Sequence, residues 1–115
     1  MPKPLTIALL AYDGFQLLDV TGPAAVFAAA NRELKRHVYK VEVLSPPGGA
    51  VRSDSGVTLQ TRAMARMLQG RIDTLLIAGA EEAALRAVVA NQAVRRWVPG
   101  RAEIGRASCR ERVCT

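Results

Sequence analysis

The stretch that decides the fold runs from residue 5 to residue 31 and reads LTIALLAYDGFQLLDVTGPAAVFAAAN. Residues 5–11 are nearly all apolar, which is typical of a β-strand buried on both faces of a parallel sheet. Residues 12–15 (YDGF) have turn chemistry. Residues 21–23 (TGP) favour the start of a helix, because Thr or Gly can cap it and proline is tolerated in the first turn. The alanine-rich segment that follows predicts a helix ending around residues 32–36, where cations complement its dipole.

The rest of the chain continues this alternation of strands and helices. The patterns predict strands over 39–44 and 73–78, a hairpin or pair of small strands over 51–60, a short helix over 63–68, and helices over 81–90 and 91–97. This order implies a mostly parallel α/β sheet with helices on both faces. Ligands of such sheets bind outside the carboxyl ends of the strands. We therefore expect the chemistry in two loops, residues 12–21 and residues 79–81.

Composition excludes several classes of protein. The chain has 115 residues, a formal net charge of +6 and 50% hydrophobic residues, which fits one globular domain or part of one. No apolar run approaches the roughly 18 residues of a membrane-spanning helix, so we expect a cytoplasmic protein without a membrane partner. The cationic residues are scattered and aromatic residues make up only 4%, which argues against direct binding of nucleic acid by these residues.

No cofactor or metal site is expected. His37 is the single histidine, and a metal site normally needs several histidine, cysteine or carboxylate ligands. Residues 48–49 (GG) follow two prolines and do not open a helix, so they indicate a turn rather than a phosphate-binding loop.

Residues 12–31 carry a family resemblance through the pattern YDGFxLLDVxGPxxVFxxAN. This pattern resembles the N-terminal region of the DJ/PfpI, class I glutamine amidotransferase-like superfamily, and in particular the GlxA-type regulators that join such a domain to an AraC-type DNA-binding domain. Residues 51–56 (VRSDSG) and 73–79 (DTLLIAG) fit that branch in order and spacing. The resemblance extends to about Trp97. It implies a flavodoxin-like, three-layer α/β sandwich that is truncated before the family's nucleophile elbow.

The resemblance also implies two candidate catalytic residues. The family's chemistry centres on a cysteine at a strand-to-helix elbow, and in isonitrile hydratase-like members the acid at the position of Asp19 is the acid/base partner of that cysteine. Asp19 could instead cap the following helix or order the turn at residues 22–23. Gly79 would border the pocket and offer a backbone N–H to an oxyanion. Gly79 could equally form only a tight turn after its strand.

The last residues of the chain look foreign to the domain. Residues 103–113 (EIGRASCRERV) resemble the translation of a short-read sequencing adapter. We therefore expect residues 1–102 to be the N-terminal part of a DJ/PfpI-like domain and residues 103–115 to be a non-native tail. We expect residues 108–112 not to form a buried strand, and neither Cys109 nor Cys114 to be the nucleophile. Because the strand before the elbow is missing, an edge of the sheet is left unpaired. An unpaired edge predicts aggregation or partner-dependent folding.

Two functions follow from the resemblance. The first is the sensing domain of a transcriptional regulator, which would bind an unknown small-molecule effector, contact DNA only through a missing C-terminal domain, and form a homo-oligomer when full length. The second is part of a stand-alone thiol enzyme of the PfpI type, such as an isonitrile hydratase or a related hydrolase. As written, the chain is expected to lack catalysis, because the nucleophile region is absent.

Overall fold

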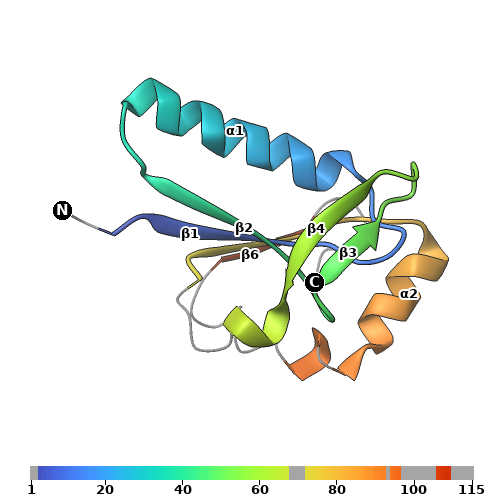
Figure 1. Ribbon diagram of the computed structural model, residues 1–115. Helices are drawn as coiled ribbons and strands as arrows, with labels where there is room; N and C mark the ends of the chain where they lie inside the picture. The colour runs from blue at the N-terminus through green and yellow to red at the C-terminus, as the bar shows by residue number, and fades with distance from the viewer. Residues whose placement is uncertain (1–2, 68–71, 93, 97–105, 110–115) are drawn as a thin grey trace.

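The computed structural model describes residues 3–67, 72–92, 94–96 and 106–109. Its centre is a six-stranded sheet in the order β3-β4-β2-β1-β5-β6, parallel except for the antiparallel β3–β4 pair (Figure 1). The strands are β1 (Leu5–Leu10), β2 (Tyr39–Ser45), β3 (Gly49–Arg52), β4 (Thr58–Ala63), β5 (Thr74–Ile77) and β6 (Arg106–Cys109). The helices are α1 (Leu18–Leu34), the short 3-10 helix η1 (Met64–Met67) and α2 (Glu82–Ala90). The predicted α/β class and mostly parallel sheet are confirmed.

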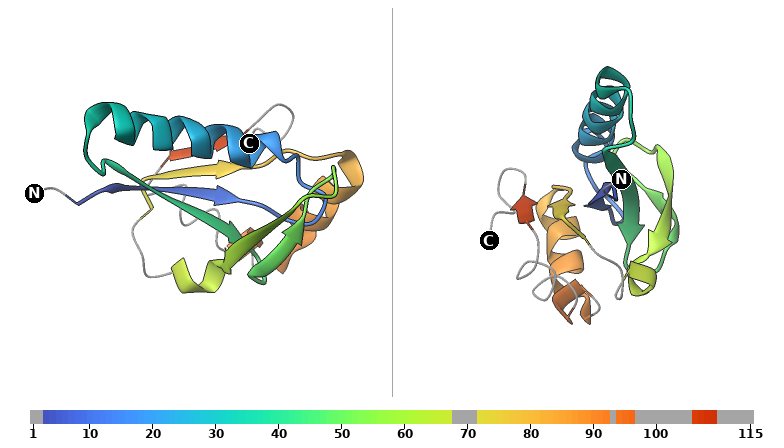
Figure 2. Two further views of the ribbon diagram at one scale, coloured as in Figure 1. Left: turned by 45° about the horizontal axis from the view of Figure 1, so that its top comes forward. Right: turned by 90° about the vertical axis from the view of Figure 1, so that its left-hand side faces the viewer.

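The connections explain why α1 and α2 cover opposite faces of the sheet (Figures 1 and 2). The chain leaves β1 through α1 and moves one way in the sheet to β2, and it leaves β5 through α2 and moves the other way to β6. Because parallel crossovers are right-handed, opposite directions of travel place the two helices on opposite faces. The order therefore reverses between β1 and β5, and the carboxyl ends of these two strands form a topological switch point.

Strand β1 runs through the middle of the core. Residues 7–11 are at most 2% exposed, because β1 has β2 and β5 as neighbours and a helix layer on each face. Leu44 of β2 and Leu75 of β5 pack in the same cluster. Continuous burial accounts for the unbroken apolar run of this strand, whereas a half-exposed strand would alternate apolar and polar residues.

Helix α1 begins at Leu18, earlier than the predicted start at residues 21–23. Pro23 therefore lies inside the helix and lacks the N–H that would donate to the Asp19 carbonyl. Two tertiary anchors extend the helix upstream of the proline, since Asp19 and Val20 are its two buried residues. The hydroxyl of Thr21 donates to the Leu17 carbonyl at 3.1 Å and closes the first turn. Packing of the first turn thus overrides the local preference for proline near a helix start.

The far end of α1 is fastened by Asn31. Its side-chain Nδ2 donates to the Tyr39 carbonyl, and its Oδ1 accepts the N–H groups of Val38 and Tyr39, each at 2.9 Å. The rings of Phe27 and Tyr39 pack with centroids 4.9 Å apart. Helix α1 is thereby fixed to the first residue of β2, and the helix ends within the predicted range of residues 32–36.

Strand β6 is an edge strand that the sequence analysis did not predict. Arg106–Cys109 form a parallel strand beside β5, with Cys109 in register with Ile77. Backbone pairing needs no particular side chains, and the free edge of β5 offers its N–H and C=O groups as a template. A short, polar segment is typical of an edge strand. The outer strands of the sheet are therefore β3 and β6, and the edge on the β5 side lies at β6.

The remaining predicted elements have mixed outcomes. The hairpin is formed by β3 and β4, and η1 occupies the predicted short helix. Residues 92 and 94–96 are helical, while Trp97 and Cys114 lie outside the described residues.

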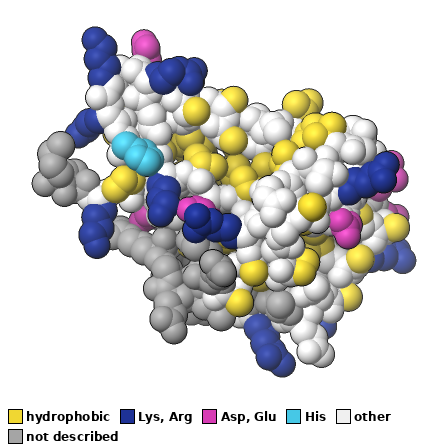
Figure 3. Space-filling model, in the orientation of Figure 1, with side chains coloured by type: hydrophobic (Ala, Val, Ile, Leu, Met, Phe, Trp, Pro, Cys, Tyr) yellow, Lys and Arg dark blue, Asp and Glu magenta, His cyan; other side chains and the backbone are white. Residues whose placement is uncertain are grey.

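No helix within the described ranges is both long and apolar enough to cross a bilayer. On the face shown in Figure 3, Lys and Arg side chains lie in small separate groups around a band of apolar side chains.

Candidate functional site

The two loops that the sequence singles out lie side by side at the switch point. The backbone N–H of Gln16 donates to the Gly79 carbonyl at 2.8 Å, and Phe15 forms an antiparallel bridge with Ala80. Just before the second loop, the Ala78 N–H donates to the Leu10 carbonyl at 3.1 Å. The loop after β1 is thus joined by its backbone to the loop after β5.

Asp19 and Gly79, the two predicted site residues, contact each other directly. The Gly79 N–H donates to Oδ2 of Asp19 at 2.8 Å in a buried setting, and Asp19 is only 7% exposed. Asp19 lies in the first turn of α1, where a negative charge is also favoured by the helix dipole. A backbone N–H that donates to a carboxylate makes a charge-assisted hydrogen bond, which is stronger than one between neutral groups. The bond therefore joins the start of α1 to the end of β5 across the switch point.

Tyr12 closes the other side of this junction. Its hydroxyl donates to the Ala78 carbonyl, and its side chain is only 5% exposed. Burial, together with the negative charge of Asp19, raises the pKa of the Tyr12 phenol well above its ordinary value. Tyr12 therefore stays protonated and keeps donating this hydrogen bond over the physiological pH range.

Phe15 connects the junction to the hairpin. Its side chain is fully buried, and its backbone bridges Ser53 on one side and Ala80 on the other. The Phe15 carbonyl accepts the Asp54 N–H at 2.9 Å. One apolar residue in a turn thus fixes three loops in relation to one another.

Gly14 allows this turn to fit against α2. Its φ is +87°, and a Cβ there would lie 2.9 Å from the Cβ of Ala84. Both the backbone angle and the close approach favour glycine. The Gly14 N–H donates to the Arg52 carbonyl at 2.8 Å, which extends the connection to β3.

The geometry limits what the Asp19–Gly79 pair can do. An oxyanion hole requires backbone N–H groups aimed at the place where negative charge develops, but the Gly79 N–H is aimed at a carboxylate. An oxyanion near Gly79 would compete with the Asp19 carboxylate for this donor and would meet a like charge. As arranged, the pair is suited to holding the switch point together and to presenting a buried acid beside it.

No metal cluster accompanies this pair. Among the residues that the structure describes, no group of three or more His, Cys, Asp or Glu side chains is placed to hold a metal ion.

Sequence reasoning missed Tyr12 and Phe15, which it assigned only to a turn. The signal that could have revealed them is the presence of two aromatic side chains in a four-residue loop directly after a buried strand. Exposed turns are normally built from small and polar residues, so aromatic residues there indicate a loop that packs inward. Ser53, only 4% exposed, was noted as part of the hairpin and of the motif at residues 51–56, but not as a residue of the site.

The arrangement of sheet, crossovers and switch point defines an α/β protein with the DJ-1/PfpI fold. The chain superimposes on a ThiJ/PfpI family protein from Pseudomonas syringae with a TM-score of 0.77 and 18% identity, covering 93% of this chain and 42% of that one. It superimposes on DJ-1beta from Drosophila melanogaster with a TM-score of 0.71 and 14% identity, covering 93% of this chain and 55% of that one. These likenesses establish the fold.

A relative is also found by sequence. The chain is 36% identical over 78 residues to a Streptomyces lividans protein described as "Uncharacterized protein in cpoL 5'region". The match covers 68% of this chain and 53% of the relative, so it spans about half the length of that protein. No family model matches the sequence.

Proposed function

We propose that residues 1–102 form the N-terminal part of a DJ-1/PfpI-superfamily sensing domain in a transcriptional regulator. In this proposal an AraC-type DNA-binding domain lies outside the 115 residues, and residues 103–115 are not native to the domain. The full-length protein is a cytoplasmic homo-oligomer that binds a small-molecule effector. The domain context rests on the resemblance of residues 12–31, 51–56 and 73–79 to GlxA-type regulators.

The observation that supports sensing over catalysis is the hydrogen bond between Gly79 N–H and Asp19 Oδ2 at 2.8 Å. A thiol hydrolase needs the acid to exchange a proton with its nucleophile and needs the backbone N–H for the oxyanion. In this chain each of the two groups is engaged by the other. A sensing domain has no such conflict, because the bond only has to hold the two loops in one arrangement.

A stand-alone thiol enzyme, such as an isonitrile hydratase or related hydrolase, is the second candidate. It is favoured by the position of β6, which ends at Cys109 and pairs with the carboxyl end of β5 at Ile77. Gly79, which donates to the Asp19 carboxylate, lies two residues beyond Ile77. A strand in this place ends at the sheet edge where Asp19 is anchored, and the cysteine elbow of a complete enzyme would follow such a strand.

The test is a long sequencing read of the source gene across the codons for residues 101–115 and beyond. The regulator proposal expects a frame without the adapter-like codons, continuing into a strand, a cysteine elbow and then a helix-turn-helix segment. A stop codon soon after one complete α/β domain would overturn it in favour of the enzyme. Recovery of codons 103–113 unchanged would overturn the assignment of the tail as non-native.

A further inference from the structure

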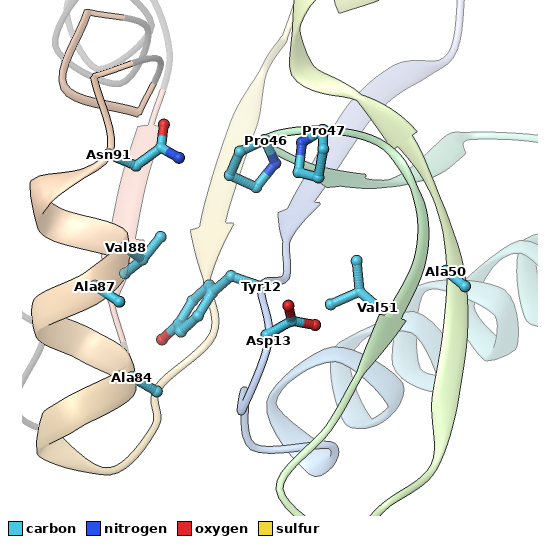
Figure 4. Close-up of a pocket in the computed structure, with 10 residues that line it drawn as sticks. All are labelled: Tyr12, Asp13, Pro46, Pro47, Ala50, Val51, Ala84, Ala87, Val88 and Asn91. Carbon is cyan, nitrogen blue, oxygen red and sulfur yellow. The ribbon is translucent and has the colours of Figure 1, made fainter.

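A cleft separate from the Asp19–Gly79 pair opens on the α2 side of the sheet edge. It has a volume of about 270 Å³ and lies between α2, the loop after β1 and the start of the hairpin (Figure 4). Neither Asp19 nor Gly79 is among the residues that line it. The cleft is therefore a second candidate binding site at the same end of the molecule.

Most of the residues that line the cleft are apolar, and several of them are buried. Val51 of β3 and Val88 of α2, which are 3% and 7% exposed, line opposite sides of the cleft with Tyr12 and Asp13 between them in Figure 4, and Pro46 adds a rigid ring. Tyr12 contributes the side of its ring, because its hydroxyl is engaged by the Ala78 carbonyl. Clefts of this kind bind small molecules chiefly through apolar contact, with a few polar groups that fix orientation.

Asp13 supplies the one carboxylate among the described residues that line the cleft. Figure 4 shows its carboxylate between the Tyr12 ring and Val51. Oδ1 of Asp13 accepts the Arg52 backbone N–H at 3.3 Å, and no ion pair to Asp13 is found in the described part of the chain. A carboxylate without a cationic partner at the side of an apolar cleft favours a ligand that brings its own positive charge.

Asn91 does not provide a competing site for the charge. Its Oδ1 already accepts the Val94 N–H at 3.2 Å, so this oxygen is used in capping the turn after α2. The ligand's cation is therefore directed to Asp13, and its carbon body to the apolar residues that line the cleft.

We propose that this cleft binds a small primary amine, with the ammonium group at Asp13 and an apolar tail between Val51 and Val88. A volume of about 270 Å³ corresponds to roughly nine water molecules at about 30 Å³ each, which suits a ligand of about six to nine non-hydrogen atoms. This proposal goes beyond the proposed function. It does not depend on whether the complete protein is a regulator or an enzyme, because it rests only on the described residues that line the cleft.

The test measures binding of n-pentylamine to the 115-residue chain by calorimetry or by chemical-shift titration. Pentanoate and 1-pentanol are the matched probes, since they keep the five-carbon tail and change only the charge of the head group. We expect saturable binding of the amine, weaker binding of the alcohol and none of the carboxylate. Equal binding of amine and alcohol, a preference for pentanoate, or no binding of pentylamine up to saturating concentrations would each overturn the proposal.

Asp13→Asn removes the charge and keeps an oxygen that can accept the Arg52 N–H, so the loop is expected to fold. We expect it to weaken pentylamine binding about fivefold, as for loss of a partly exposed ion pair. Asp54→Asn is the matched control, because Asp54 is also exposed in a nearby loop and does not line the cleft. Equal effects of the two variants would show general electrostatics rather than a site at Asp13, and would overturn the proposal.

A second pair of variants tests the location without touching a charge. Ala87 is exposed and lines the cleft, whereas Ala83 is exposed on the same helix and does not. Ala87→Leu should fill part of the cleft and reduce pentylamine binding at least about fivefold, and Ala83→Leu should leave it unchanged. Unchanged binding to Ala87→Leu would place the amine elsewhere and contradict the proposal.

Discussion

Asp13 lies in the loop after β1 and Asp19 lies in the first turn of α1, yet the structure treats these two nearby carboxylates in opposite ways. Asp19 is 7% exposed and accepts a hydrogen bond from the buried Gly79 N–H. Asp13 is exposed and faces an open cleft, with a single long hydrogen bond to the Arg52 backbone. A carboxylate in the first setting holds the fold together, and one in the second is available to a ligand. Both residues are aspartates, so residue type does not distinguish their roles, whereas the difference in burial does.

The largest loss of stability is expected at Phe15, whose buried ring and backbone bridges fix the loops around Asp19. Phe15→Ala should lower the free energy of unfolding by about 3–5 kcal/mol, because a fully buried ring leaves a cavity. Chemical denaturation of the wild type and the variant measures the difference. Phe27→Ala is the control, since Phe27 is only partly buried and should cost less. An equal or larger loss at Phe27 would show that the junction at Phe15 is not the centre of the core.

Gly14 follows Asp13 directly and lies in the turn that leads to Asp19. Its replacement tests whether this turn tolerates a side chain. Gly14→Ala should destabilise the chain by about 2 kcal/mol, from a positive φ and the approach to Ala84. Gly22→Ala is the matched control, because no atom lies within 4 Å of a Cβ at that helical position. Gly22→Ala should be neutral or slightly stabilising. A neutral Gly14→Ala would mean that the loop and α2 can move apart.

Tyr12 connects the two regions, because its ring lines the cleft and its phenol lies beside Asp19. Tyr12→Phe should cost about 1 kcal/mol at neutral pH through loss of the hydrogen bond to Ala78. The pKa of Tyr12 is raised in the folded state, so the unfolded chain releases the phenolic proton at lower pH than the folded chain. The stability contributed by the protonated phenol is therefore complete below about pH 10, the ordinary tyrosine pKa, and declines above it.

Unfolding free energies of the wild type and Tyr12→Phe between pH 7 and pH 11 measure this effect. Their difference should shrink above about pH 10, since only the wild type carries the buried phenol. A difference that stays constant or grows with pH would contradict a raised pKa at Tyr12.

Much of the fold could be predicted from local pattern. The apolar run at residues 5–11, the alternation at 39–44 and the apolar strand at 73–78 correspond to the three central strands, because burial on a sheet imposes these patterns directly. The pairing of the two loops at the sheet edge also follows, since parallel strands bring their carboxyl ends together.

The structural details that the sequence did not predict depend on contacts between residues that are far apart in the chain. The hydrogen bond of Asp19 joins residues 60 positions apart, and the same anchor shifts the start of α1 to Leu18, so that Pro23 lies within the helix. Strand β6 could not be predicted from its polar side chains, because its pairing with β5 uses the backbone. The cleft beside Asp13 needs three separate segments in place before it exists. The catalytic roles of Asp19 and Gly79 stay predictions from resemblance.

The most direct test of the contrast between the two acids is the unfolding free energy of Asp19→Ala and Asp13→Ala, measured side by side in denaturant at neutral pH. Asp19→Ala leaves the buried Gly79 N–H without its acceptor and should lose about 2–3 kcal/mol. Asp13→Ala leaves an exposed N–H that water can satisfy and should stay within about 0.5 kcal/mol of the wild type. Equal losses, or a larger loss for Asp13→Ala, would contradict the assignment of Asp19 to the fold and of Asp13 to the cleft.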